Sequence, residues 1–143
     1  MNKLSLSYPA KIEKDEDEFL VTFRDLPNVF ANGESKQEAI FNAQEVLDLL
    51  LEEMHKDKLD IAIPSKNKKG EIMVPVSPEI AAPIMLRRLR LIHNYTFEDV
   101  ARIMNVKYQT YQQIESGKNI TLKSLRKAAM AFGATVELGF LTN

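Results

Sequence analysis

The chain of 143 residues has no cysteine, no tryptophan, two histidines and no long apolar run. The lack of cysteine excludes disulfides and thiolate-ligated metal sites, and it is typical of a reducing compartment. A membrane-spanning helix needs about 20 consecutive apolar residues, and no segment approaches that length. The opening sequence, MNKLSLSYPA, lacks the continuous apolar core of a signal peptide. We therefore expect a cytoplasmic protein that does not enter the membrane.

Charge is unevenly distributed along the chain, although the net charge is only −1. Residues 1–76 contain 10 Lys and Arg against 15 Asp and Glu, a net charge of −5, whereas residues 77–143 contain 9 against 5, a net charge of +4. An acidic half beside a basic half suggests different partners for each. The basic half could bind phosphate and the acidic half a basic protein, unless each is simply a solvated surface.

The first half of the chain begins with predicted strands. Apolar residues alternate over 4–12, which predicts a strand with one buried face. The acidic segment 14–18 predicts a turn into a second strand at 19–23, which is rich in β-branched and aromatic residues. The sequence DLPN at 25–28 predicts a break, and a short third strand is expected at 29–31.

One amphipathic helix is predicted after these strands. Ser35 and Glu38 form a capping box, so the helix should span about 36–55. Its apolar stripe consists of Ala39, Ile40, Ala43, Val46, Leu47, Leu50 and Met54. The segment 72–76 predicts a last strand, and its Pro75 favours a sheet edge. A single helix covers one sheet face, so the other face or an edge should bind a partner chain.

The second half of the chain is predicted to be helical. Ser77 as the cap and Pro78 in the first turn indicate a helix start, but Pro83 leaves open a short turn followed by a helix over 83–94. Three further helices are predicted. Thr96 with Asp99 is a capping box for a helix to about 104, Gly117 stops a helix that runs from 107 to 115 or 116, and Thr121 caps a helix to 132 that Gly133 stops. The last residues, in which Val136, Leu138 and Phe140 alternate with other types, predict a C-terminal strand that could pair with a second copy of the chain.

Residues 100–119 predict two helices that meet at Asn105, a residue type that tolerates the left-handed conformation of such a turn. The predicted packing set is Val100, Ala101, Met104, Val106, Tyr111 and Ile114. The predicted outward set is Lys107, Tyr108, Gln109, Gln112, Gln113 and Ser116. Glutamine can bond adenine bidentately in the major groove. The second helix of this predicted helix-turn-helix therefore carries candidate base-reading residues.

The spacing over 86–133 resembles the helix-turn-helix of phage repressors, the XRE type. The resemblance implies that Gln109 and Gln113 read bases, helped by Tyr108 and Gln112. It implies phosphate contacts from Lys107, Lys118, Asn119 and Thr121, and an internal ion pair between Arg90 and Glu115. Phe97 stands where the family often has a DNA-contacting glutamine, so that contact should be absent. Asn105 replaces a common glycine, which is a mild change.

Residues 8–47 resemble the HicB antitoxin family. The matching pieces are Tyr8-Pro9-Ala10, Phe23 with Asp25-Leu26-Pro27, Gly33, and the helix start at Ser35, Glu38 and Ala39. Arg24 and Asn28 replace a usual proline and a usual glycine, both at loop positions. The resemblance implies an α+β domain with a partial RNase H-like sheet that lacks catalytic carboxylates.

The family also implies a function. Such a domain binds a small basic HicA toxin, an mRNA-cleaving protein, and blocks its active site, while the helix-turn-helix represses the operon. We accordingly expect a toxin-binding domain over 1–76 and a DNA-binding domain over 77–143. The protein should act as a homo-dimer or tetramer and without a cofactor. A one-component transcription regulator whose first domain senses another ligand is the alternative.

Enzymatic chemistry is not expected from these residues. Nuclease chemistry needs carboxylates that converge on metal ions, whereas those at 15–18 are consecutive at a predicted hairpin tip. His55 and His93 both end predicted helices, where the helix dipole favours them. The aromatic residues Phe19, Phe23, Phe30 and Phe41 are interpreted as core of the sheet-and-helix domain.

Overall fold

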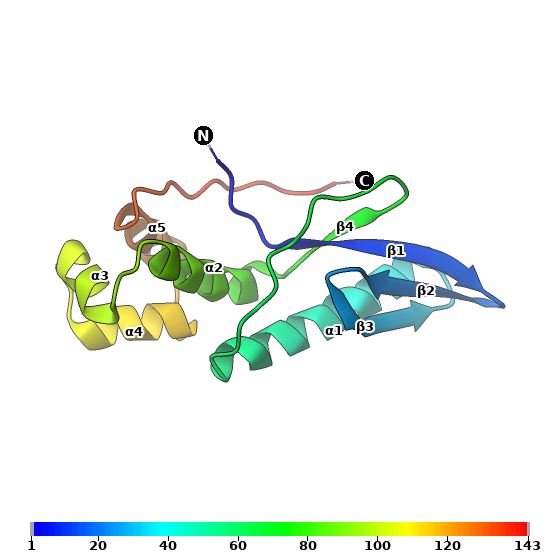
Figure 1. Ribbon diagram of the computed structural model, residues 1–143, viewed down its shortest axis with the longest axis horizontal. Coiled ribbons are helices and arrows are strands. Elements are labelled where there is room, and N and C mark those ends of the chain that lie inside the picture. Colours follow the sequence, from blue (N-terminus) through cyan, green and yellow to red (C-terminus); the bar gives the residue numbers. More distant parts are fainter. Residues whose placement is uncertain (1, 143) are drawn as a thin grey trace. The chain divides into compact units, whose positions relative to one another are not determined.

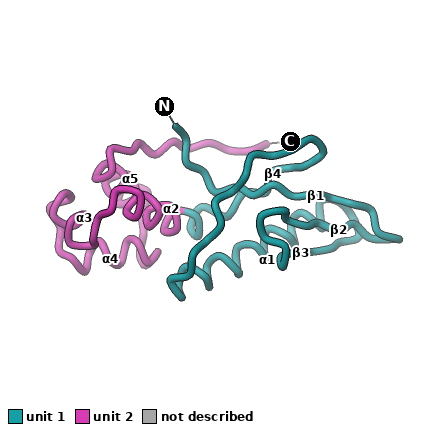
Figure 2. Tube along the Cα trace, in the orientation of Figure 1, with its two compact units in different colours: residues 1–81 teal, residues 82–143 magenta. Residues whose placement is uncertain are grey.

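The computed structural model describes residues 2–142 and forms two compact units, residues 1–81 and 82–143 (Figure 2). The elements, labelled in Figure 1, are β1 (Ser7–Asp15), β2 (Glu18–Phe23), β3 (Leu26–Gly33), α1 (Lys36–Lys56), β4 (Ile72–Pro75), α2 (Pro78–Ile92), α3 (Phe97–Met104), α4 (Tyr108–Ser116) and α5 (Leu122–Met130). The predicted α+β unit followed by a helical unit is therefore confirmed.

The first unit is built on an antiparallel sheet with the strand order β3-β2-β1-β4. The hairpin β1–β2 pairs Ala10 with Phe23 and turns at Glu16, whose φ is 56°. β3 is longer than predicted because it already pairs with β2 at Leu26, beyond a register shift at Thr22/Phe23. β4 lies at one edge, as Pro75 predicts, since proline cannot donate a ladder hydrogen bond.

Helix α1 covers one face of this sheet, chiefly over β3 and β2 (Figure 1). Ser35 caps it by accepting the Glu38 amide proton, as predicted, but the predicted capping box is incomplete because the Glu38 carboxylate accepts the Glu34 amide proton instead of that of Ser35. Its buried residues are spaced by four and are Ala39, Ala43, Leu47 and Leu51. The small residue Gly33 allows the close approach, because a Cβ there would lie 2.5 Å from the Ala39 backbone nitrogen. The sheet and α1 thus enclose the core of this unit.

Two of the four phenylalanines interpreted as core are on the surface. Phe23 is buried, but Phe30 is 63% exposed and Phe41 is 60% exposed. On β3, Val29 and Ala31 take the buried positions, so the side chain of Phe30 between them lies on the face away from α1. Phe41 follows Ala39 by two residues, which places it on the solvent side of α1. The core interpretation was wrong for both.

The segment between α1 and β4 is tied to the start of β3. Arg24 binds Glu71 through two nitrogens, at 3.0 and 3.1 Å, and donates to the Lys66 carbonyl at 2.9 Å. Asp25 accepts from the backbone and hydroxyl of Ser65, both at 2.7 Å. The Arg24 guanidinium and the Lys68 backbone lower the pKa of Glu71 to about 2. Arg24, a departure from the family pattern, thus has a structural role in this chain.

Helix α2 starts at Pro78 and continues through Pro83, so the second of the two predicted alternatives is wrong. The Ser77 side chain does not cap the helix. Its hydroxyl and amide both donate to Asp48, at 2.5 and 2.9 Å, a contact between residues far apart in sequence. Pro83 is the sixth residue of α2, so its missing amide leaves one helical hydrogen bond, to the Glu79 carbonyl, unmade.

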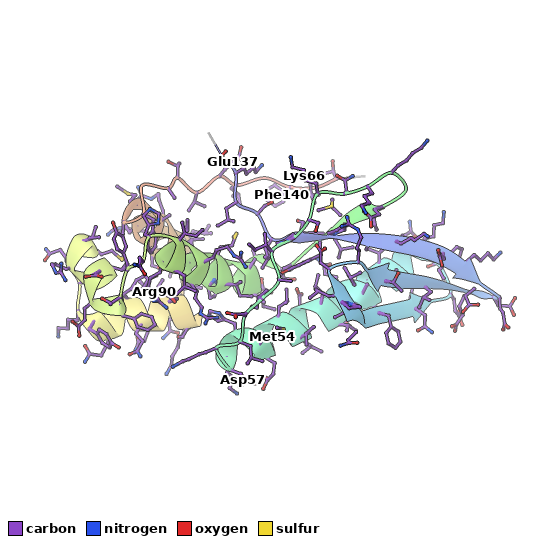
Figure 3. The ribbon with its side chains drawn as sticks, viewed as in Figure 1. Met54, Asp57, Lys66, Arg90, Glu137 and Phe140 are labelled. Carbon is purple, nitrogen blue, oxygen red and sulfur yellow. The ribbon has the colours of Figure 1, made fainter. Side chains whose placement is uncertain are left out.

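The second unit packs α2, α3, α4 and α5 around one apolar core. The buried members are Leu86, Val100, Ala101, Tyr111, Ile114, Ala128 and Phe132. The predicted C-terminal strand is wrong for the described residues, because the chain has no regular structure from Ala134 to Thr142. A strand requires a neighbouring backbone for its hydrogen bonds, and the alternation of apolar residues does not supply one. Phe140 is 86% exposed there (Figure 3).

Candidate nucleic-acid interface

The turn between α3 and α4 is set by caps at both ends of α3. Thr96 and Asp99 form a reciprocal capping box at its start, as predicted, and the Thr96 backbone lowers the pKa of the Asp99 carboxyl. Asn105 ends α3 in the left-handed conformation, with φ 57° and ψ 49°, as its residue type predicts. The chain therefore leaves α3 sharply and begins α4 at Tyr108.

Helix α4 has a buried side and an uncharged polar side. Tyr111, Ile114 and Glu115 are buried, whereas Gln109 and Gln113 lie on the opposite side of the helix and are exposed. Gln112 and Thr110 are exposed on the flanks of that side. Amides four residues apart on one solvent-facing line can reach the edges of neighbouring base pairs. The structure thus places Gln109, Gln112 and Gln113 together on one accessible surface.

Tyr108 is held by packing and is less available than the glutamines. It is 38% exposed, and its ring meets the Phe97 ring edge-on at 5.9 Å. Phe97 also lies against Tyr111 and under the Arg90 guanidinium, 4.2 Å from its ring centroid. Sequence reasoning saw only a missing DNA contact at Phe97 and missed this packing role. The signal was available, since an aromatic residue can cover a buried arginine.

An ion pair joins α2 to α4. Arg90 (labelled in Figure 3) binds both carboxylate oxygens of Glu115, with its Nε 2.9 Å from Oε2 and its Nη2 2.9 Å from Oε1. Its Nη1 donates to the Tyr95 carbonyl at 3.2 Å. Glu115 is buried. The burial of Tyr111 and the nearby Glu115 charge together raise the pKa of the Tyr111 hydroxyl. Because a bidentate pair fixes orientation as well as distance, it holds α4 in place from its inner side.

The connection from α4 to α5 presents donors for an anion. Gly117 ends α4 in the left-handed region with φ 87°, and Lys118 and Asn119 follow it on the surface. Thr121 caps α5 by accepting the Ser124 amide proton, and its own amide donates to the Ser124 hydroxyl. Sequence reasoning missed Ser124, because the capping-box pattern has Glu or Gln at that position.

The free backbone donors at this position belong to the two residues that follow Thr121. The amides of Leu122 and Lys123, in the first turn of α5, have no acceptor among residues 2–142, and a helix N-terminus favours phosphate there. Lys107 is the N-cap residue of α4, and its exposed side chain makes no capping hydrogen bond. The predicted phosphate-binding residues thus lie on both sides of the glutamine surface in sequence, with Lys107 before it and Lys118, Asn119 and Thr121 after it.

The described residues contain neither a metal-ligand cluster nor a membrane-spanning helix. No group of three or more His, Cys, Asp and Glu side chains in 2–142 could hold a metal ion. No helix in that range is long and apolar enough to span a bilayer. The glutamine surface with its flanking donors is therefore the candidate site that the second unit offers.

Comparisons with known proteins match both halves of the chain. The family model of the HicB-like antitoxin of bacterial toxin–antitoxin systems matches residues 7–82, and a helix-turn-helix model matches residues 86–138. Antitoxin HicB 2 of Photorhabdus laumondii is 31% identical over 135 residues, which cover 94% of this chain and 96% of that protein. Antitoxin HicB 1 of the same organism is 26% identical over 136 residues, with 94% and 86% covered.

Solved structures of the Burkholderia pseudomallei antitoxin HicB are also similar. The N-terminal domain structure has 23% identity and a TM-score of 0.41, covering 50% of this chain and 96% of that one. The antitoxin structure has 16% identity and a TM-score of 0.46, covering 75% and 90%. The family model and the sequence relatives, taken with the geometry above, are decisive. The chain belongs to the HicB antitoxins of bacterial toxin–antitoxin systems, a non-enzymatic family, and it carries an XRE-type helix-turn-helix DNA-binding domain in its C-terminal part.

Proposed function

We propose that the chain neutralises a HicA-type mRNA-cleaving toxin and represses transcription of its own operon in the cytoplasm. The N-terminal unit would bind the small basic toxin and occlude its active site, with no cofactor involved. The observation that carries the proposal is the joining of an acidic HicB-like segment, 7–82, to a basic helix-turn-helix segment, 86–138.

Base reading is assigned to the exposed side of α4. Gln109 and Gln113 are the principal readers, because they lie opposite the buried side of the helix. Gln112 contributes from the flank, and Tyr108 contributes less because its ring packs on Phe97. Each bidentate amide-to-adenine contact would discriminate among bases by about 1–3 kcal/mol.

Phosphate binding is assigned to the residues that flank the readers. Lys107 and Lys118 supply charge, and Asn119 and Thr121 supply polar donors. The Thr121 hydroxyl oxygen accepts the Ser124 amide proton. The hydroxyl proton of Thr121 is therefore free to donate to a phosphate oxygen. The Leu122 and Lys123 amides add backbone donors at the same place. These contacts set the register of the protein on DNA without reading its sequence.

Operator binding should require two copies of the chain. Helix-turn-helix proteins bind half-sites about 34–36 Å apart as symmetric dimers. The apolar side chains of Leu138, Phe140 and Leu141 are largely exposed in the single chain, which supports their burial by a second copy. A second contact through the N-terminal units would give a tetramer.

Purification of the chain from its native host under gentle conditions tests this function. We expect a small basic protein to co-purify at nearly equal amounts and to arrest growth when expressed alone. Co-expression of the chain should restore growth, and the chain should bind its own promoter. Promoter binding without any toxic partner would instead support a one-component regulator whose N-terminal unit senses another ligand.

A variant of the full chain separates the two activities. Gln113→Ala should derepress the promoter while growth remains protected from the toxin, because the residue lies in the second unit and on its exposed surface. Loss of toxin protection in this variant would contradict the assignment of the two activities to different units.

A further inference from the structure

The solvent side of α1 has an unusual composition. Phe41, Glu45, Leu49 and Glu52 recur at spacings of four, four and three, so they form one line opposite the buried Ala43 and Leu47. We call these four residues the acidic–apolar stripe. Phe41 is 60% exposed and Leu49 is 69% exposed. Two large apolar side chains on the solvent face of a single helix indicate a surface that another molecule covers.

The charge around this stripe has one sign. Residues 37–54 contain five Asp and Glu and no Lys, Arg or His. Two of these carboxylates have internal roles, since Glu38 accepts the Glu34 amide proton and Asp48 holds Ser77. The carboxylates of Glu45, Glu52 and Glu53 are exposed and make no ion pair or hydrogen bond within residues 2–142. Three exposed carboxylates without a basic partner attract a cationic surface.

The charge also decides which occupant fits the apolar side chains. A second copy docked face to face would bring like charges together, which costs free energy and disfavours that pairing. A basic protein with an apolar groove would instead match both features of the stripe. The geometry points to the acidic–apolar stripe of α1 as the docking surface for the basic toxin, with Phe41 and Leu49 as anchors. This inference rests on the proposed function.

The same unit offers a matched control on its other face. Phe30, on the sheet face away from α1, is exposed to nearly the same degree as Phe41. Its surroundings differ, because the carboxylate of Glu13 on that sheet is paired with Lys11 at 2.8 Å. Truncation of either phenylalanine removes the same exposed side chain, so only the position differs. The two variants therefore tell the two faces apart.

The test titrates the full chain with the purified HicA-type toxin of the same operon, by isothermal titration calorimetry. We expect the double variant Phe41→Ala/Leu49→Ala to bind the toxin at least roughly thirtyfold more weakly, the loss typical of interface anchors. Phe30→Ala should bind as the wild-type chain does. Operator binding and thermal unfolding should be retained in both variants, because all three side chains are exposed.

A second measurement tests the charge. Toxin binding by the wild-type chain should weaken as salt is raised, and Glu45→Gln/Glu52→Gln should reduce that dependence and slow association. Equal toxin affinity in the Phe41→Ala/Leu49→Ala variant and the wild-type chain would overturn the inference. Weakening by Phe30→Ala alone would also overturn it and would place the toxin on the open sheet face. A wild-type chain that binds no toxin would overturn the proposed function itself, and the inference with it.

Discussion

Helices α1 and α4 both carry solvent faces that ordinary surface helices do not have, yet the two faces differ in kind. The face of α1 combines exposed Phe41 and Leu49 with unpaired carboxylates. The face of α4 presents Gln109, Gln112 and Gln113 and no charged side chain. Large apolar side chains gain from burial against another protein, whereas neutral amides match the donors and acceptors of base edges. The composition of each face thus indicates the class of its partner.

The two helices also differ in what holds them. Helix α1 is anchored by apolar packing of Leu47, Leu51 and two alanines against the sheet. Helix α4 combines apolar packing with the buried pair of Arg90 and Glu115. Truncation of a packed apolar side chain lowers the free energy of unfolding by an amount that grows with the cavity it leaves. For a buried ion pair, the free energy of unfolding falls most when only one partner is removed, because the other charge then stays buried without a partner.

The largest effect is expected from breaking that pair. Glu115→Ala should lower the free energy of unfolding of the second unit by about 3–5 kcal/mol, since Arg90 is left buried without its carboxylate. Chemical denaturation of the full chain measures this change. The double variant Arg90→Met/Glu115→Leu should recover most of the loss, because neither charge then remains. A single variant as stable as the wild-type chain would show that the pair does not anchor α4.

A somewhat smaller effect is expected on the packed side of α1. Leu47→Ala should lower the free energy of unfolding by about 2–5 kcal/mol through the cavity it leaves. Leu49→Ala, two residues away on the solvent side of the same helix, should change it by less than about 0.5 kcal/mol. Thermal unfolding of both variants provides the comparison. Similar losses in the two would contradict the described orientation of α1.

Variants at the exposed glutamines of α4 should change DNA binding and leave the free energy of unfolding unchanged. Gln113→Ala should weaken operator binding by about 1–3 kcal/mol while nonspecific DNA binding is nearly unchanged. Lys118→Ala should instead weaken binding to all DNA and lower the salt dependence by about one counterion. Electrophoretic mobility shifts at several salt concentrations distinguish the two variants. An equal loss on both kinds of DNA would show that Gln113 does not read bases.

The smallest effect is expected at the exposed pair of Arg24 and Glu71, which contrasts with the buried pair. Arg24 holds the pKa of Glu71 at about 2, below its usual value of 4.5. Because the pKa is lowered in the folded chain, the Glu71 carboxylate stabilises the fold at pH values above 4.5. This contribution is lost as the pH falls from 4.5 toward 2. The thermal unfolding difference between wild-type chain and Glu71→Gln should be small and should vanish over this interval. A difference that is independent of pH would mean that the carboxylate charge is not involved.

Local signals in the sequence located most elements correctly. Caps depend on residues three or four apart, so Ser35, Thr96 and Thr121 each predicted a helix start that the structure contains. The left-handed residues Asn105 and Gly117 likewise predicted where α3 and α4 end. The outward position of Gln109 and Gln113 followed from the helical period. These features depend only on residues that are close together in the sequence, so they can be predicted from it.

The features that failed depend on distant contacts. Helix α1 has apolar residues on most of its circumference, so the period alone could not decide that Leu51 faces the sheet and Phe41 does not. Ser77 was interpreted as a cap, but Asp48, on another element, binds its hydroxyl. The predicted C-terminal strand did not form, and that segment has no partner backbone among the described residues. In each case the deciding neighbour lies far away in the chain or outside it.

The inward position of the Arg90–Glu115 pair has a consequence for the divergence of this domain. The pair holds α4 from its buried side, opposite the exposed glutamines, so the identity of the outward side chains contributes little to stability. Substitutions at Gln109, Gln112 and Gln113 can therefore accumulate without unfolding the domain. Under the proposed function, substitutions at these three positions would give duplicated copies of the operon separate operators, and neither copy would then repress the other.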